Sequence, residues 1–391
     1  MSWVGRQVNE RTDHRTGRPS VLLVVEQLRR SVPGGIGTYA QGLLTGLAAL
    51  DAAPVGVGAE PTDLTLFASR VAPDPLVHWG RPVRTSRLPS RLLTRAWDRG
   101  LARAPSGFDV IHGVSFAAPA PARGARGAFV VTVHDLAWRS HPEATTPRGR
   151  RWHEAALARA LHRADAFVTP SAAVAHQLVA AGAAVDAVSV IREGSDHLPP
   201  PDRAGATAML RASGVDGPYL LAVATLQPRK NLRRLVEAYG AARSALPEPL
   251  PLVVAGPLGW GDSGLGGAAS DGVVAVGHVE GATLSGLYAG ATALAYVPLA
   301  EGFGLPPLEA MVAGAPVVAS TAVPSVTEAE GEPPALLVDP TDTDAIAEAL
   351  VTIASDRGLS EALRARGAAF AKSLTWEATA SSHLALWERL S

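Results

Sequence analysis

The stretch Glu301-Gly-Phe-Gly-Leu-Pro-Pro-Leu-Glu309 decides how this chain can be interpreted. It follows the short apolar run Ala293–Val297 and leads into an apolar segment that ends near Ala313 and Gly314. This order predicts a strand, a glycine-containing turn and a helix. The glycines let a ligand approach the backbone, and the two prolines suit a first helical turn, where no N–H is needed. Taken alone, the stretch equally fits a corner with two solvated glutamates.

The start of that helix is a candidate anion site. The two prolines remove two of its four free N–H donors, so an anion would be held mainly by the N–H groups of Gly304 and Leu305. We expect Glu309 in the first turn, where the helix dipole keeps its carboxylate ionised. The stretch therefore combines a place for an anion with two hydrogen-bond acceptors.

Composition limits the class of protein. With 391 residues, 47% hydrophobic and 18% charged, the chain predicts two globular domains rather than a disordered protein. The net charge of -1 gives no indication of a nucleic-acid partner, and the lack of cysteine excludes disulfides and thiol catalysis. No apolar run approaches the ~18 residues that span a bilayer. We expect residues 1–19, which are polar and Arg-rich, to be a mobile tail and the protein to be cytoplasmic.

Strands and helices alternate in both halves of the chain. This alternation predicts α/β architecture, with two doubly wound, mostly parallel sheets. The run of prolines that begins at Pro199 marks a linker region, residues 199–215. We expect an N-terminal domain over residues 20–198 and a C-terminal domain over residues 216–373.

Polar residues follow predicted strands at the edge where such sheets bind ligands. His134 comes directly after the strand 129–133, where it could also be a loop or helix-capping histidine. Arg229 and Lys230 follow the first strand of the second domain, and Asn231 can cap the next helix. Adjacent cations there suit a diphosphate leaving group, although a solvated pair is the plainer interpretation. The Gly34–Gly37 turn is a further anion-binding corner or a tight connection.

Taken together, these segments resemble the retaining GT-B glycosyltransferases of family 4. The resemblance covers nearly everything from Ser20 to Leu390. The segments that carry it, in chain order, are Gly34-Gly-Ile-Gly37, Val133-His-Asp-Leu136, Thr169-Pro-Ser171, Thr225-Leu-Gln-Pro-Arg-Lys-Asn231, Gly277-His-Val279, Glu301–Met311, Gly314-Ala-Pro-Val-Val318 and Val338-Asp-Pro340. The version of the Arg-Lys segment, preceded by Ala224-Thr225, resembles the mannosyltransferase-like branch. Arg192-Glu-Gly-Ser-Asp196 departs from the family pattern of Asn-Gly-Val-Asp.

The resemblance implies two Rossmann-like domains that face a cleft, with a C-terminal helix, about 374–391, crossing back to the first domain. It implies that Glu309 binds the ribose of a nucleotide and that Glu301 binds the transferred sugar. Further implied contacts come from Phe303 and Gly304 to the sugar, from Leu305 and the Gly35–Gly37 loop to the diphosphate, and from His278 and Val279 to the base.

The implied reaction is sugar transfer from a nucleotide-diphosphate co-substrate. GDP-mannose is the first expected donor and a UDP-sugar the second, with a glycan, lipid-linked or small-molecule acceptor. Charge leaves onto phosphate, so the cations Arg229 and Lys230 matter more than a strong base, and His134 lies against the sugar. A GT-B epimerase or phosphorylase and a non-catalytic sugar-binding partner are the alternatives.

We expect no metal and no other cofactor. Asp342-Thr-Asp344 looks like a metal-binding pair of acids, but it opens a predicted helix, where capping is its expected role. The seven arginines between Arg81 and Arg103 suggest peripheral contact with anionic lipids at the inner face of the membrane.

Overall fold

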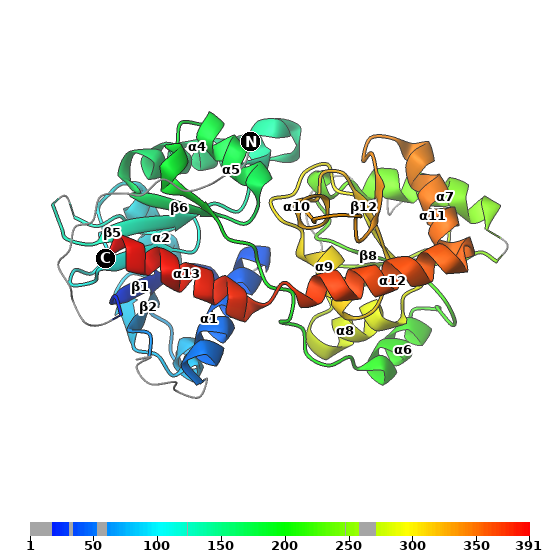
Figure 1. Cartoon of the computed structure of the whole chain (residues 1–391), viewed down its shortest axis with the longest axis horizontal. Coiled ribbons are helices and arrows are strands. Elements are labelled where there is room, and N and C mark those ends of the chain that lie inside the picture. The colour runs from blue at the N-terminus through cyan, green and yellow to red at the C-terminus, as the bar shows by residue number, and fades with distance from the viewer. Residues whose placement is uncertain (1–17, 31–33, 53–60, 123, 247, 258–270) are drawn as a thin grey trace.

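The computed structural model describes residues 18–30, 34–52, 61–122, 124–246, 248–257 and 271–391. It contains two α/β lobes side by side, joined by two stretches of chain (Figure 1). Most of the expected N-terminal tail and most of the glycine-rich piece between residues 256 and 272 lie outside the described residues. Within the described ranges, no helix has the length and hydropathy needed to cross a membrane.

The first domain is built on a seven-stranded parallel sheet in the order β3-β2-β1-β4-β5-β6-β7. Its strands are β1 (Val21–Val24), β2 (Leu64–Ser69), β3 (Val83–Ser86), β4 (Val110–Gly113), β5 (Ala128–Thr132), β6 (Ala166–Thr169) and β7 (Val188–Val190). Its helices are α1 (Gly34–Ala52), α2 (Ser90–Asp98), α3 (Ala137–Ser140), α4 (Pro147–Arg163) and α5 (Ala172–Ala180). The central strands are almost fully buried, as apolar strands covered by helices on both faces must be.

The second domain repeats this arrangement with a six-stranded parallel sheet in the order β10-β9-β8-β11-β12-β13. Its strands are β8 (Leu220–Val223), β9 (Leu252–Ala255), β10 (Val273–Gly277), β11 (Ala293–Tyr296), β12 (Val317–Ser320) and β13 (Leu336–Val338). Its helices are α6 (Arg203–Ala212), α7 (Leu232–Ala245), α8 (Gly281–Gly290), α9 (Leu305–Val312), α10 (Pro324–Thr327), α11 (Thr343–Ser355) and α12 (Arg357–Lys372).

Three local expectations need correction. The edge strand β3 was not predicted, because its sequence Val-Arg-Thr-Ser is half exposed and lacks an apolar run. The glycines Gly34–Gly37 do not form a turn before the helix but are its first turn. The expected linker, residues 199–215, contains α6, which packs on α8 of the second domain.

The last helix, α13 (Trp376–Leu390), returns to the first domain and packs along α1 (Figure 1). Gly42 and Gly46 make this close packing possible, because a Cβ at either position would overlap Trp376. Nε2 of His383 on α13 lies 2.8 Å from the hydroxyl oxygen of Tyr39 on α1. The chain therefore crosses between the domains twice.

Asp342, the first acid of the pair Asp342 and Asp344, has the expected capping role. The Asp342 carboxylate accepts a hydrogen bond from the backbone N–H of Ala345 at 2.9 Å and caps α11.

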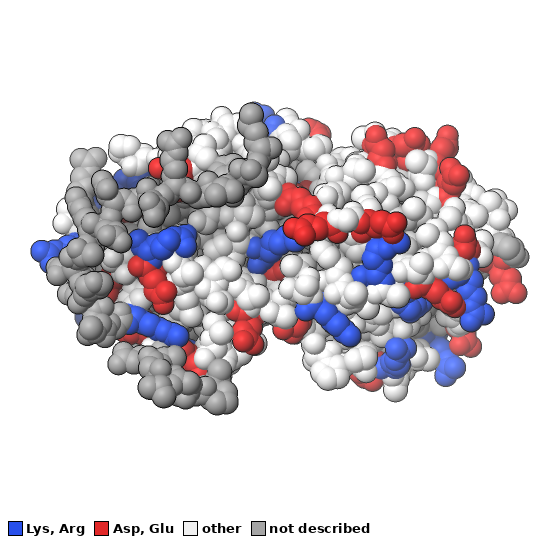
Figure 2. Space-filling view, viewed as in Figure 1, with Lys and Arg blue, Asp and Glu red and all other residues white. Residues whose placement is uncertain are grey.

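Charged residues of both signs are interspersed over the face seen in Figure 2, where a waist separates the two lobes.

Candidate active site

A cleft of about 560 Å³ lies between the domains, at the carboxyl ends of the central strands of both sheets. It brings together nearly all of the candidate residues, which are Gly35, His134, Arg229, Lys230, His278, Val279, Glu301, Phe303, Gly304, Leu305 and Glu309. Gly37 is the exception, since it is buried inside α1 and does not line the cleft. The topology explains the gathering, because parallel strands end at one edge of a sheet.

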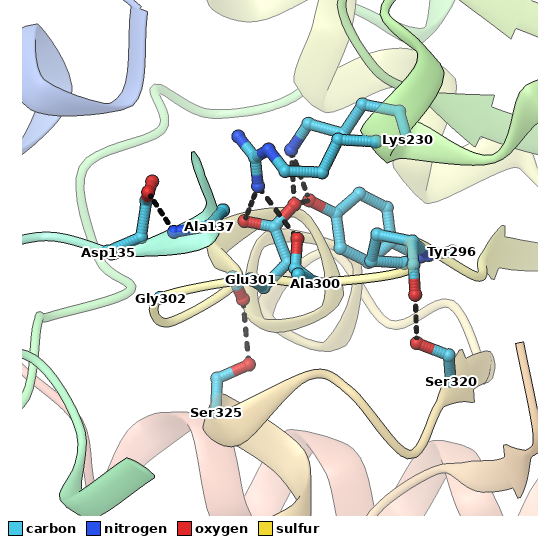
Figure 3. Close-up of polar contacts among 12 residues, drawn as sticks. Asp135, Ala137, Lys230, Tyr296, Ala300, Glu301, Gly302, Ser320 and Ser325 are labelled. Atoms are coloured by element: carbon cyan, nitrogen blue, oxygen red, sulfur yellow. Dashed lines mark hydrogen bonds and ion pairs between the residues drawn. The ribbon is translucent and has the colours of Figure 1, made fainter. Parts of the chain in front are cut away.

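Glu301 is the centre of a buried charge cluster (Figure 3). Its Oε1 accepts a hydrogen bond from Lys230 and another from the Tyr296 hydroxyl at 2.8 Å. Its Oε2 lies 3.1 Å from Nη1 of Arg229, which also donates to the Ala300 carbonyl at 2.8 Å. The two cations expected to bind a diphosphate therefore also contact the acid expected to bind the sugar.

The charges in this cluster stabilise one another. Burial disfavours the charged form of Glu301, but Lys230 and Arg229 outweigh it and lower the pKa of the carboxyl to about 2. Glu301 in turn raises the pKa of the Arg229 guanidinium, whereas burial lowers the pKa of the Lys230 ammonium. With two positive charges and one negative, the cluster presents a net positive charge to the cleft.

Glu309 occupies a different environment from the one expected. It lies in the second turn of α9, not in the first, because the helix begins at Leu305. Its carboxylate accepts hydrogen bonds from the Tyr288 hydroxyl at 2.7 Å and from Nε2 of His197 at 2.9 Å. Side-chain donors, rather than the helix dipole, therefore orient this carboxylate at the cleft.

The backbone at the start of α9 needs the glycine that the sequence provides. Gly304 has a φ of 102°, and a Cβ there would press on Val323. The Ser325 hydroxyl donates to the Gly304 carbonyl at 2.7 Å and fixes this turn. Gly304 and Leu305 consequently line the cleft. Leu305 is the first residue of α9, so its N–H has no acceptor within the helix.

His134 lies on the opposite wall, directly after β5. Its Nε2 is 2.9 Å from the Val114 carbonyl and must donate there, because a carbonyl oxygen only accepts. Its Nδ1 is 3.4 Å from Oε1 of Glu193, a buried residue in the loop that departs from the family pattern. The Tyr39 ring meets the imidazole edge-on at 4.8 Å between centroids. The ring is thus held in one orientation at the cleft.

Asn231 does not cap α7 with its side chain. It adopts a left-handed conformation, with a φ of 58°, and its amide donates to the Val297 and Pro340 carbonyls at 2.9 and 2.7 Å. Asparagine tolerates this conformation better than most residues. It therefore joins the Arg-Lys loop to the segments that follow β11 and β13.

The two walls of the cleft touch directly. A Cβ at Gly302 would overlap the carbonyl oxygen of His134, and the Ser171 hydroxyl donates to the Gly302 carbonyl at 2.7 Å. Glu328 of the second domain accepts the backbone N–H groups of Ala172 and Ala173 at 2.9 and 2.8 Å. These contacts join the two domains directly.

Sequence reasoning missed several residues of the site. Tyr288, Tyr296 and His197 orient the two glutamates, and Glu193 approaches His134. The tyrosines lie inside an apolar helix and an apolar strand, where they are indistinguishable from core residues. Only Glu193 gave a signal, because it stands in the segment that departs from the family pattern.

In the described part of the chain, no group of three or more His, Asp or Glu side chains is placed to hold a metal ion.

Two family models match the chain. The model for glycosyl transferases group 1 matches residues 217–356, and the model for Glycosyltransferase Family 4 matches residues 33–197. O-antigen chain mannosyltransferase B of Escherichia coli is 38% identical over 164 residues, which are 41% of this chain and 42% of that protein. The chain thus spans less than half the length of this relative.

Other relatives match longer segments. A D-inositol 3-phosphate glycosyltransferase of Actinosynnema mirum is 34% identical over 239 residues, 57% of either chain. Among solved structures, sucrose-phosphate synthase from Thermosynechococcus elongatus has a TM-score of 0.74 at 22% identity, over 95% of this chain and 99% of that chain. HepE from Anabaena, in complex with UDP and glucose, has a TM-score of 0.68 at 17% identity, over 94% and 99%. These similarities show that the two-domain arrangement is the GT-B fold.

Proposed function

Since the chain belongs to the group 1, family 4 glycosyltransferases, we propose that it transfers a hexose from a nucleotide-diphosphate sugar to a hydroxyl group. The donor proposed first is GDP-mannose, and a UDP-sugar is proposed second. The similarity to O-antigen chain mannosyltransferase B supports the first choice. The acceptor is a glycan, a lipid-linked saccharide or a small molecule.

One observation carries this proposal: the Arg229–Lys230–Glu301 cluster shares a cleft with Glu309 on its own wall and with His134 on the facing wall. A departing diphosphate needs positive charge that is already in place, and Arg229 and Lys230 supply it. Glu301 and Glu309 supply acceptors for the hydroxyls of a sugar and a ribose.

The same geometry supports a role for each group. Negative charge accumulates on the diphosphate as the glycosidic bond breaks, and the net positive cluster stabilises it together with the Leu305 N–H. His134 donates a hydrogen bond from Nε2–H to the Val114 carbonyl, and its Nδ1 faces Glu193, so neither ring nitrogen is placed as a free base. We propose transfer with retention and without a metal ion, since these cations take the place of a metal in neutralising the diphosphate.

We also propose that the enzyme works in the cytoplasm, in peripheral contact with the inner face of the membrane. Arg81 pairs with Asp51 and Arg84 lies over the Phe108 ring, so these two are not available to lipids. The remaining arginines of the segment accompany exposed leucines, with Leu92 50% and Leu101 77% exposed. Cations beside exposed apolar side chains suit an anionic membrane surface.

The donor proposal is tested by thermal unfolding with GDP, UDP and their sugar conjugates. A ligand present at 100 times its Kd adds about 2.7 kcal/mol to the free energy of unfolding. We expect GDP-mannose to raise the melting temperature and to be turned over. If no nucleotide raises it, the donor site proposed here is wrong. The anomeric configuration of the product, determined by NMR, tests retention.

A further inference from the structure

A second cavity adjoins the cleft and has no role in donor binding as proposed above. Its volume is about 230 Å³, and it shares Asp135, Gln227 and Arg229 with the cleft. Asp135 lies across from Glu301 (Figure 3). The other residues that line the cavity come from the first domain and are Ala137, Trp138, Ala144, Thr145, Thr146 and His153. A molecule bound at the reacting centre can therefore extend past Asp135 into this space.

The lining suits a saccharide. It combines two hydroxyl groups, a primary amide and a carboxylate with an aromatic pair, since His153 stacks on Trp138 at 4.5 Å with 18° between the planes. Nδ1 of His153 is buried and has no hydrogen-bond partner in the described structure. Burial lowers the pKa of His153, although Asp135 and Glu154 oppose this. A neutral imidazole can donate or accept a hydrogen bond to a sugar hydroxyl.

The charges around the cavity disfavour a phosphorylated ligand. Arg229 is the one cationic side chain among its lining residues, and this guanidinium already contacts Glu301 and the Ala300 carbonyl. Asp135 presents a carboxylate from the opposite side. The Thr146 hydroxyl oxygen accepts a hydrogen bond from the Gly149 N–H at 3.1 Å and so caps the start of α4. The first-domain residues of the adjoining cleft add Glu193 and contribute neither Lys nor Arg.

We propose that this cavity is an acceptor subsite that binds an uncharged saccharide unit, adjacent to the unit that receives the transferred sugar. This inference rests on the proposed glycosyl transfer. It specifies a neutral glycan acceptor of at least two sugar units and excludes a sugar phosphate. The length of the acceptor and the absence of charge on it are the two properties to measure.

The test compares acceptors with one GDP-mannose donor. The probes are p-nitrophenyl α-mannoside, the p-nitrophenyl α-mannobiosides of each linkage, and a mannose phosphate. Two additional hydrogen bonds in the cavity predict a kcat/KM about tenfold higher for at least one bioside than for the monosaccharide. We expect the mannose phosphate to be the poorest acceptor.

Thr145→Tyr fills the cavity and should raise the KM for the preferred bioside about tenfold relative to the KM for GDP-mannose. Gln227→Ala, which removes one amide without adding bulk, should raise the same ratio by a smaller factor. Thr45→Tyr, on the exposed face of α1, is the matched control and should behave as wild type. The melting temperature of each variant shows whether it is folded.

The outcomes separate this inference from the proposed function. The subsite is refuted if no bioside exceeds the monosaccharide, if folded Thr145→Tyr and Gln227→Ala both keep the wild-type KM ratio, or if the mannose phosphate is the best acceptor. Failure of every nucleotide sugar to bind or to be hydrolysed would instead refute the proposed glycosyl transfer.

Discussion

Replacing Lys230 by methionine should abolish most of the turnover while leaving the fold intact. Methionine keeps the apolar stem of the side chain and removes the ammonium group that contacts Glu301 and donates to the Tyr296 hydroxyl at 2.9 Å. Two unit charges 4 Å apart interact by about 4 kcal/mol at an effective dielectric constant near 20. Because Arg229 remains and Glu301 offsets part of the charge, we expect kcat to fall about 100- to 1000-fold, the range found when one oxyanion donor is lost.

The effect of Lys230→Met on stability should be small by comparison. Glu301 keeps Arg229 at 3.1 Å and Tyr296 at 2.8 Å, so its carboxylate is not left without partners. We therefore expect a loss of about 1–2 kcal/mol, below the 3–5 kcal/mol typical of breaking a buried pair completely. For domains of this size the melting temperature should fall by about 2–8 °C.

Single-turnover kinetics with GDP-mannose and thermal unfolding measure the two quantities separately. Lys372→Met is a matched control, because Lys372 is the other lysine of the chain and is exposed at the end of α12. We expect the control to retain wild-type kcat. A kcat within about threefold of wild type in Lys230→Met would refute the role of this ammonium group in stabilising the leaving diphosphate.

Three further predictions concern other parts of the molecule. Glu309→Gln should raise the KM for the donor about tenfold with little change in kcat, since a ribose contact is the same in the ground and transition states; an equal loss in kcat would contradict this. Burial lowers the pKa of His383 to about 4, so its contribution to stability is complete above pH 6.5 and is lost as the pH falls from 6.5 towards 4. His383→Gln should therefore show a weaker decrease in melting temperature between pH 7 and pH 5 than wild type, and an unchanged decrease would exclude His383 as its source. Glu328→Ala removes the carboxylate that accepts two N–H groups across the domain boundary, so we expect a larger radius of gyration by small-angle scattering; identical curves would show that this contact does not hold the domains together.

The sheets could be predicted from the sequence because their strands are short apolar runs at regular spacing. β5 and β11 lie within one residue of the strands expected at 129–133 and 293–297. The exposed edge strand β3 has no such pattern and was missed. The start of α1 was placed too late, because glycine is a poor helix former and Gly34–Gly37 suggest a turn.

The site was predictable to the extent that its residues lie on loops after strands. Arg229, Lys230 and Glu301 share one rim because parallel strands of one sheet end there, and that much follows from the alternation of strands and helices. That Glu301 binds both cations does not follow, because it depends on distances of 2–4 Å between segments about 70 residues apart. The roles of Tyr288 and Tyr296 depend likewise on which way two core side chains direct their hydroxyls.

The contacts in the Arg229–Lys230–Glu301 cluster bear on how Glu301 could bind a sugar while Arg229 and Lys230 bind a diphosphate. Without a donor, Arg229 and Lys230 need an anion, because unpaired charges in a partly buried cleft are costly, and Glu301 provides it. A diphosphate brings two further negative charges and competes for the same cations. The Glu301 carboxylate then has fewer donors and can accept hydroxyls of the sugar, while the Tyr296 hydroxyl keeps it oriented. We therefore propose that binding of the nucleotide exposes Glu301 to the sugar. Glu301→Gln should then weaken recognition of the sugar more than binding of the free nucleoside diphosphate, as calorimetry with GDP and GDP-mannose can measure.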